Sequence, residues 1–173
     1  MTFKTRKLAA GTAIACLTLL SVVTGCKKSN SNSNAIGASA NVGAAAFATP
    51  IITGAHNLGP SWRINFFQVI AIQVKGNDST AIQVAIMDTV KVNQTVATDG
   101  DNNIYYYPVY NVWGSEFDAD PMGGGHGTIT ITAKDTTAKT IAGTFHGVLY
   151  NNNSPVTADS IIVSNGRFNT TYQ

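Results

Sequence analysis

Cysteine is almost absent from this chain of 173 residues, which has only Cys16 and Cys26. Both lie near the N-terminus, so a domain formed by the rest of the chain has neither a disulfide bond nor a free thiol. Charge is also scarce, because only 12% of the residues are Asp, Glu, Lys or Arg. We therefore expect a domain that is held together by its hydrophobic core alone.

An excess of positive charge is absent from the region that we expect to fold. The full chain has 11 basic and 9 acidic residues, but five of the basic residues lie within the first 28 positions. The rest of the chain has six basic residues against nine acidic ones. Binding to nucleic acid requires a basic face, so we predict no nucleic-acid partner.

Residues 1–25 have the layout of a secretory signal peptide. A basic start with Lys4, Arg6 and Lys7 precedes an uncharged, mainly apolar run over residues 8–23. This run is shorter than the ~20 residues that a helix needs to span a bilayer. We therefore predict an exported protein whose signal peptide is removed.

Residues 23–26, with the sequence Val-Thr-Gly-Cys, resemble the bacterial lipobox, in which an aliphatic and two small residues precede a cysteine. The resemblance implies cleavage before Cys26, diacylglycerol on its sulfur, and a fatty acyl chain such as palmitate on its new amino group. Each buried CH₂ contributes about 0.8 kcal/mol, so several acyl chains would form a permanent anchor. The alternative is an ordinary secretory signal that happens to contain a cysteine.

The segment after the cysteine has the composition of a linker. Asn and Ser dominate residues 29–34, and small residues dominate residues 35–46. Neither composition can bury much apolar surface. We predict a lipidated cysteine and a flexible tether over residues 26–46, followed by a β-sandwich domain over residues 47–173.

The residues next to Cys26 also bear on location. The surface-export signal of Bacteroidetes lipoproteins places acidic residues just after the lipidated cysteine, whereas this chain has Lys27 and Lys28 there. We therefore expect the periplasmic face of the outer membrane rather than the cell surface.

From residue 47 onward, apolar residues alternate with polar ones and keep no helical period over three turns. Short turns rich in Asn, Asp, Gly and Thr separate the alternating runs. This pattern predicts an all-β fold, a single antiparallel sandwich or partly closed barrel of seven or eight strands. The apolar residues that share a face within each run are Trp62, Ile64, Phe66, Ile70, Ile72 and Val74; Ile82, Val84 and Ile86; Ile129 and Ile131; and Ile141, Phe145 and Leu149.

Glycines in the C-terminal strands carry two further expectations. Gly143 and Gly147 share the face of Phe145, which predicts that a bulky group packs over them. The pair Asn165-Gly166 interrupts the last strand and predicts a β-bulge.

The last third of the chain follows the pattern G-x-I-x-I, a turn, I-x-G-T-F, a second turn, and an aliphatic strand that ends in G-x-F. The matching positions are Gly127, Ile129, Ile131, Ile141, Gly143, Thr144, Phe145, Ile161, Val163, Gly166 and Phe168. The pattern resembles the C-terminal signature of small Bacteroidetes-type lipoproteins grouped as a domain of unknown function (DUF6252-like). The resemblance covers roughly residues 105–170 and implies an envelope-anchored β domain, but it implies no catalytic or binding residue.

Two histidines lie on the outer face of the expected C-terminal hairpin. One register pairs His126 with His146, and the other pairs Thr128 with His146 and leaves His126 diagonal to it. With a carboxylate from the upstream loop, two imidazoles could hold zinc or another transition metal. The loop acids are Glu116, Asp118 and Asp120. The alternative, which we favour, is a pair of solvated histidines, because a glycine-rich loop does not pre-position the third ligand.

An aromatic stretch precedes that loop. Tyr106 and Tyr110 fall on one face of the expected strand, and Tyr105, Tyr107 and Trp113 fall on the other. Exposed Tyr and Trp rings can stack on sugars or anchor a protein partner, which makes Tyr105, Tyr107, Tyr110 and Trp113 candidate ligand-binding residues. The alternative is that both faces are covered by the rest of the protein.

Other motifs are weak. Asp99, Asp101 and Asn103 have the 1-3-5 spacing of a calcium loop, but Ile104 replaces its glycine and Tyr110 replaces its final glutamate, which favours a simple turn. No nucleophile elbow or phosphate-binding glycine loop is present, so we predict no catalytic residue, no cofactor and no enzymatic activity. An Asp-Ser/Thr-aliphatic/Thr pattern resembles the O-glycosylation motif of Bacteroidetes, with acceptors at Ser79, Thr89, Thr136 and Ser160.

Together these features favour a lipid-anchored envelope protein that binds or supports another molecule without catalysis. A glycan or an envelope protein is the partner that we expect besides the membrane. A glycan-binding accessory protein and a metal-binding protein or metalloenzyme remain the alternatives.

Overall fold

The computed structural model describes residues 35–58, 65–110, 116–151 and 159–173. These residues form eleven β-strands and one short 3-10 turn, η1 (Pro121–Gly123), with no α-helix among them. None of the described segments is a helix long and apolar enough to cross a membrane. The prediction of an all-β fold is confirmed, with more strands than the seven or eight expected. The strands are β1 (Gly37–Val42), β2 (Ala45–Thr49), β3 (Ile52–Asn57), β4 (Phe66–Lys75), β5 (Asp78–Met87), β6 (Thr95–Ala97), β7 (Asn103–Tyr107), β8 (Phe117–Asp118), β9 (His126–Asp135), β10 (Thr140–Asn151) and β11 (Ser160–Thr171).

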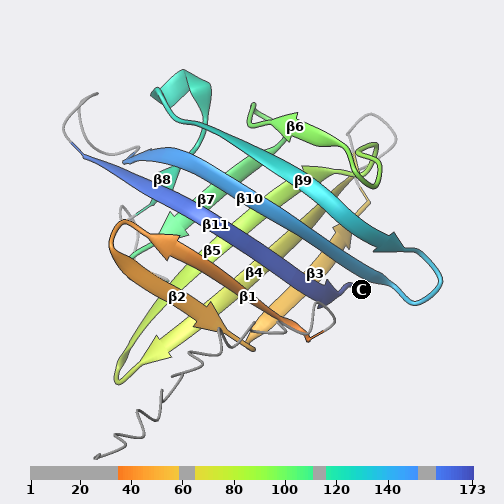
Figure 1. Ribbon diagram of the computed structural model, residues 1–173, viewed down its shortest axis with the longest axis horizontal. Coiled ribbons are helices and arrows are strands. Elements are labelled where there is room, and N and C mark those ends of the chain that lie inside the picture. The colour runs from red at the N-terminus through yellow and green to blue at the C-terminus, as the bar shows by residue number, and fades with distance from the viewer. Residues whose placement is uncertain (1–34, 59–64, 111–115, 152–158) are drawn as a thin grey trace, which may run out of the picture. The chain divides into compact units, whose positions relative to one another are not determined.

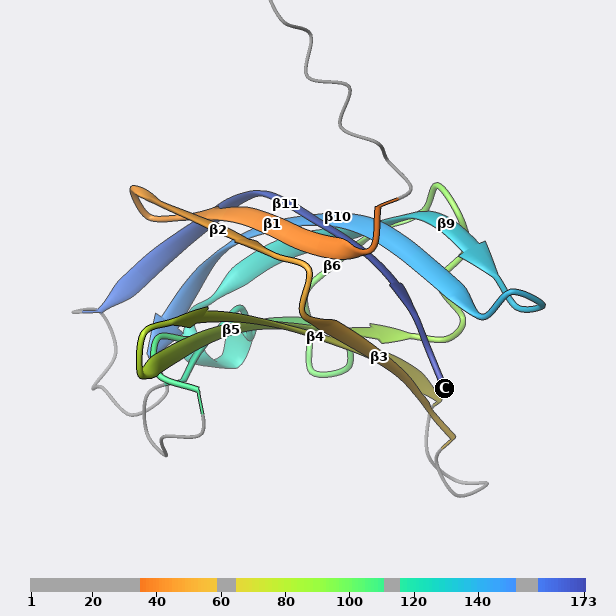
Figure 2. The same cartoon turned by 90° about the horizontal axis from the view of Figure 1, so that it is seen from below.

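All strands belong to one antiparallel sheet with the order β2-β1-β11-β10-β8-β7-β5-β4-β3 (Figure 1). Strand β10 has two partners on the same edge, because β9 pairs with residues 140–148 and β8 pairs with residues 150 and 151. The short strand β6 extends the sheet beyond β9. Seen from the side, the sheet curls into two facing layers, with β1, β2, β9, β10 and β11 in one and β3, β4 and β5 in the other (Figure 2).

The sheet is nearly closed into a barrel, because β3 at its end returns to the end of β11. Gly54 forms a parallel bridge with Tyr172. The amide of His56 donates to the carbonyl of Gln173 at 2.9 Å, and the amide of Gln173 donates to the carbonyl of Gly54 at 3.3 Å. A Cβ atom at Gly54 would lie 2.7 Å from the Thr171 carbonyl oxygen, so glycine permits this close approach.

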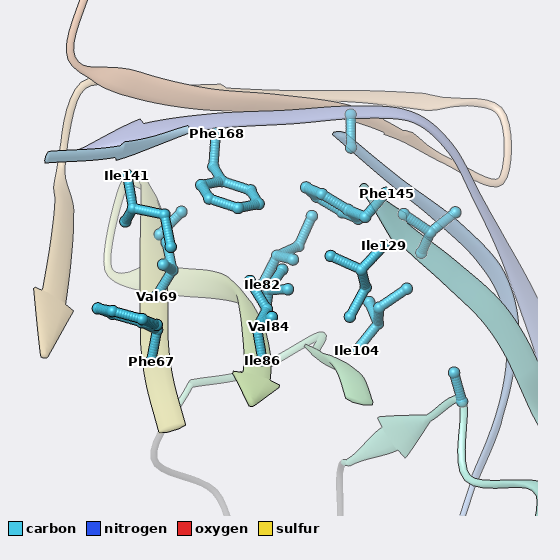
Figure 3. Close-up of a cluster of buried hydrophobic side chains, with 14 of the residues drawn as sticks. Phe67, Val69, Ile82, Val84, Ile86, Ile104, Ile129, Ile141, Phe145 and Phe168 are labelled. Atoms are coloured by element: carbon cyan, nitrogen blue, oxygen red, sulfur yellow. The ribbon is translucent and has the colours of Figure 1, made fainter. Parts of the chain in front are cut away.

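The core fills the space between the two layers (Figure 3). The predicted inward residues of β5, β9 and β10 are confirmed, because each is at most 3% exposed. These residues are Ile82, Val84, Ile86, Ile129, Ile131, Ile141, Phe145 and Leu149. Phe67, Val69, Ile104 and Phe168 complete the centre of the cluster.

The face that the even-numbered apolar residues of β4 share is not its core face. Phe67, Val69 and Ala71, at odd positions, are each 2% exposed and point into the core. The even-numbered apolar residues lie on the outer face instead: Phe66, Ile70, Ile72 and Val74. Both faces of β4 are apolar, so alternation alone could not identify the inner one. Trp62 and Ile64 lie outside the described residues.

The folded part begins earlier than predicted. Residues 37–46, which we had assigned to the tether, contain β1 and part of β2. β1 pairs with β11, and its small residues Ala40 and Val42 are buried in the core. Alanine-rich segments bury little apolar surface per residue. Here the neighbouring strand supplies hydrogen-bond partners for the backbone, so the segment folds as the continuation of a large sheet.

Most of the detailed expectations for the C-terminal strands are confirmed. Asn165 has a φ of 52°, and the β10–β11 register shifts beside it, which is the predicted bulge. The ring of Phe168 packs over Gly143 as predicted, since a Cβ atom there would lie 2.6 Å from Phe168 Cζ. At Gly147 the nearest atom is the backbone carbonyl oxygen of His126, not a bulky side chain.

Candidate functional site

A row of tyrosines lies on the outer face of β7 and just beyond its end. The rings of Tyr105 and Tyr107 are nearly parallel, at 21°, with centroids 6.5 Å apart. The ring of Tyr110 meets Tyr107 edge-on, with centroids 6.2 Å apart. All three are half-buried. We call Tyr105, Tyr107 and Tyr110 the tyrosine row.

The position of Tyr110 corrects the sequence prediction, which placed it on the face of Tyr106. Strand β7 ends at Tyr107, immediately before Pro108, so strict alternation stops there. The amide of Tyr110 donates to the carbonyl of Ser79 at 2.7 Å, which holds it beside the other rings. Tyr106 points to the opposite face and packs against Phe117 with centroids 6.3 Å apart. Trp113 lies outside the described residues.

Two carboxyl groups border the tyrosine row. Asp118 lies directly across from Tyr105 in the β7–β8 pair and is 4% exposed. Burial raises the pKa of Glu116, and the negative charge of Asp118 raises it further. Burial is also the main cause of the raised pKa of both Tyr105 and Tyr107. The row is therefore a partly desolvated aromatic surface with hydrogen-bonding carboxyl groups beside it.

The row rests on a firm base. Ala81 of β5 pairs with Tyr107 on one side and with Ile72 of β4 on the other. Ala81 lies on the outer side of the sheet, yet it is 0% exposed. Tyr105 is paired in the same way with Gln83. The rings of Tyr105 and Tyr107 therefore stand on a paired, covered strand surface, which limits their movement, and Tyr110 joins them from the turn that follows β7.

The two predicted histidines lie on the outer face of another part of the sheet. His146 pairs with Thr128, and His126 pairs with Val148, so the diagonal register is the correct one. Thr128 Oγ1 lies 3.3 Å from both ring nitrogens of His146. Both imidazoles are exposed, which fits the alternative of solvated histidines.

A third metal ligand does not join the two histidines in the described part of the chain. No group of three or more His, Cys, Asp or Glu side chains there could hold a metal ion. The Asp120 carboxylate accepts the amide of Met122 at 2.9 Å, and the Asp118 carboxylate accepts the amide of Asp120 at 3.1 Å. These carboxylates shape the loop around η1.

The calcium-like residues 99–103 form a turn, as the sequence favoured. The Asp99 carboxylate accepts the amides of Asp101 at 2.9 Å and Asn102 at 2.6 Å. The Asn102 side chain in turn accepts the amide of Met87 at 3.0 Å. Asp99 therefore caps its own turn in the way that Asx residues commonly do.

A charged cluster that the sequence analysis missed lies near the barrel seam. The carboxylate of Asp88 accepts a hydrogen bond from Lys134 Nζ at 2.8 Å and lies 3.2 Å from His56 Nε2. The His56 ring stacks on the Phe67 ring, with centroids 4.4 Å apart. Lys134 Nζ lies 4.6 Å from the centre of the Phe67 ring. The cluster joins β3, β9 and the turn that follows β5, so it holds together the strands near the seam of the barrel. We call His56, Asp88 and Lys134 the Asp88 clamp.

No short-range signal could have identified this cluster. His56 and Asp88 are 32 positions apart, and Asp88 and Lys134 are 46 apart. Only the pairing of distant strands brings them together. His56 and Asp88 stand between uncharged neighbours in the sequence, and Lys134 is followed by Asp135, so nothing local connects the three.

The candidate glycosylation positions differ in accessibility. Thr89, Thr136 and Ser160 are exposed, and Thr136 lies in the turn between β9 and β10. Ser79 is half-buried within β5, and its carbonyl accepts the Tyr110 amide. Thr89 and Thr136, which both lie in turns, therefore offer more room for a sugar than Ser79 does.

The tyrosine row is the surface whose chemistry is best suited to a ligand, because it combines stacked rings with carboxyl groups on a rigid strand. Comparison with known proteins found no similarity: no protein-family model matches the chain, and no curated protein or solved structure matches it.

Proposed function

We propose that this protein is a lipid-anchored cell-envelope lipoprotein whose β domain is a non-enzymatic binding module. The signal-like start, the lipobox-like residues 23–26 and the lack of an ordered catalytic motif support this proposal. The resemblance to small Bacteroidetes-type lipoproteins points the same way, and Lys27 and Lys28 favour the periplasmic face of the outer membrane.

The early start of the fold adds a consequence for the anchor. Ten residues, 27–36, separate Cys26 from the first residue of β1. A fully extended chain of that length reaches roughly 35 Å at most. On this proposal the domain stays within about one domain diameter of the bilayer, where its partner must also be found.

The anchor is tested by metabolic labelling with palmitate. The wild-type protein and Cys16→Ser should both incorporate label and remain in the membrane fraction, whereas Cys26→Ser should do neither. The Cys16→Ser variant is the matched control, because its cysteine lies within the predicted signal peptide. Equal labelling of wild type and Cys26→Ser would remove the anchor from the proposal.

We further propose that the bound partner is a glycan. The observation that carries this proposal is the tyrosine row, with three half-buried rings in contact and the Glu116 carboxyl group nearby. Sugar rings stack on aromatic faces, and their hydroxyl groups donate to carboxylates. An envelope protein is the other partner for such a surface, since tyrosines also anchor protein interfaces.

The glycan proposal is tested by affinity electrophoresis through gels that contain xylan, mannan or soluble starch, together with a glycan microarray. We expect wild type to be retarded by at least one glycan and Tyr107→Ala to lose that retardation. Tyr106→Phe is the matched control, because Tyr106 lies on the opposite face. Absence of any glycan signal for wild type, or retardation that Tyr107→Ala leaves unchanged, would refute the proposal.

A further inference from the structure

A hollow of about 610 Å³ lies on the outer face of β9, β10 and β11, away from the tyrosine row. Cross-strand pairs of residues form its floor. Val148 of β10 lies between His126 and Ile162, and Thr144 of the same strand pairs with Arg167. His146 lies between these two rows, opposite Thr128.

The bulge in β11 shapes one side of this hollow. Asn165 adopts a φ of 52°, and the pairing with β10 shifts by one residue there. The extra residue lies beside His146 and bends the strand, as bulges commonly do. Arg167 follows on the outer face, exposed, and among the described residues no carboxylate forms an ion pair with it.

The electrostatics of this face differ from those of the rest of the domain. Strands β1, β2, β10 and β11 contain no acidic residue. β9 has only Asp135 at its end, whose carboxylate accepts the amides of Thr137 and Ala138 in the adjoining turn. Every other acidic residue of the chain lies on the remaining strands and loops. The acidic residues nearest to these strands lie at one end of the β10–β11 pair, where Asp118 pairs with Tyr150 and Asp159 precedes β11. Arg167 therefore provides positive charge on a face whose own strands contain almost no acidic residue, in an otherwise acidic domain.

The hollow offers two kinds of contact. Arg167, the imidazoles of His126 and His146 and the hydroxyl of Thr128 can each donate a hydrogen bond. Ile162 is 60% exposed and, with Val148, forms an apolar floor on the other side. A guanidinium binds carboxylate and phosphate groups in a two-pronged manner, which a lysine cannot do.

We propose that this hollow binds a small amphiphilic oxyanion, a molecule with one phosphate or carboxylate group on Arg167 and His146 and a short apolar portion on Val148 and Ile162. The site is separate from the tyrosine row and does not depend on glycan binding or on the anchor. The negative charge of the rest of the domain disfavours binding of such an anion elsewhere.

The proposal is tested by NMR titration of a protein that begins just before β1 and continues to residue 173. The probes are hexyl phosphate, hexanoate, inorganic phosphate and hexanol. We expect hexyl phosphate or hexanoate to shift the amide signals of residues 144–148 and 162–167 and to bind tighter than inorganic phosphate and hexanol. Equal affinity for hexanol would overturn the role of the charge, and equal affinity for inorganic phosphate would overturn the apolar floor.

Variants separate the site from general charge effects. Arg167→Gln should weaken binding of the best probe by roughly tenfold or more, because a hydrogen bond to a charged group is lost. Lys75→Gln removes the same charge from the exposed end of β4 and should leave affinity unchanged. Arg167→Lys and His146→Gln should give intermediate losses, so the result does not depend on one variant folding. No binding by wild type, or equal affinity in Arg167→Gln and Lys75→Gln, would refute the site.

Discussion

The ring of Phe168 lies directly over Gly143, its cross-strand partner, at the centre of the β10–β11 pair. The next pair on the same face is the reverse, since Phe145 lies over Gly166, where a Cβ atom would be 2.5 Å from two ring carbons. The two rings touch each other, with centroids 6.3 Å apart. The glycines and phenylalanines of the C-terminal pattern are therefore one packing unit, in which each aromatic ring covers the glycine opposite.

This relationship predicts that Gly143→Ala destabilises the protein by about 1–3 kcal/mol, because the new methyl group has no free space. A Cβ atom there would also lie 2.6 Å from the Thr130 carbonyl oxygen, which cannot move without breaking the β9–β10 pair. Urea denaturation measures the change. Gly100→Ala is the matched control, since a Cβ atom there meets nothing within 4 Å. Equal midpoints for the two variants would contradict the packing.

The Asp88 clamp predicts a loss of stability in acid. The hydrogen bond from Lys134 lowers the pKa of Asp88, and the charges of Lys134 and His56 add to this effect, whereas burial opposes it. A lowered folded-state pKa stabilises the fold above the ordinary value of about 4, and this contribution disappears as the pH falls through the lower folded-state value.

We therefore expect Asp88→Asn to be less stable than wild type by about 1 kcal/mol near neutral pH, a modest value because the side chain is partly exposed to solvent. The difference should shrink toward zero as the pH falls below the ordinary carboxyl value of about 4 and through the lower folded-state value. Urea denaturation at several pH values measures it. Asp101→Asn, which removes an exposed carboxylate from a turn, serves as the control. A difference that persisted unchanged in acid would mean that the ion pair is not its source.

Glu116 predicts the opposite dependence on pH. Burial and the charge of Asp118 raise its pKa, so the folded state disfavours the ionised form. This cost is absent below the ordinary pKa of about 4 and grows as the pH rises to the higher folded-state value. Glu116→Gln should therefore be slightly more stable than wild type at pH 7, by about a few tenths of a kcal/mol, because solvent screens this partly exposed carboxyl group. Thermal unfolding at pH 4 and pH 7 checks the sign, and a less stable variant at pH 7 would contradict it.

The barrel seam predicts a local effect of Tyr172. This residue is 8% exposed, and its ring meets Phe67 edge-on at 4.9 Å and His56 at 6.0 Å. Tyr172→Ala should cost about 3 kcal/mol and loosen the hydrogen bond from the His56 amide to Gln173. Hydrogen exchange should therefore accelerate at His56 more than at Val84 in the core. Uniform acceleration at both amides would show that the seam has no local opening of its own.

The sequence predicted the C-terminal strands well for a physical reason. In residues 128–132 and 144–146, threonine or histidine alternates with isoleucine or phenylalanine, so only one face suits the core. The same reasoning failed in β4, where both faces are apolar and only the pairing of Val69 with Val84 identifies the inner side. It also missed β1, whose alanines carry too little apolar surface to be recognised without their partner strand.

The candidate sites show the same division. The tyrosine row was predicted from adjacent residues, and only Tyr110 changed sides, because the strand ends before Pro108. Hairpin geometry limited the His126–His146 relationship to two registers, and the pairing of His146 with Thr128 in the structure selects the diagonal one. By contrast, the Asp88 clamp depends on three distant segments, and the hollow near Arg167 depends on the shape that a bulge gives to the sheet, which no local pattern specifies.

The double partnership of β10 has a consequence for how the molecule comes apart. Its long central section holds β9 and β11 of one layer, while its last two residues hold β8, the link toward β7 and β5 of the other. Neither layer can separate from the other without breaking the pairing of β10 with its neighbouring strands. We expect thermal melting in a single calorimetric step, with the slowest-exchanging amides of the whole chain lying along residues 141–149.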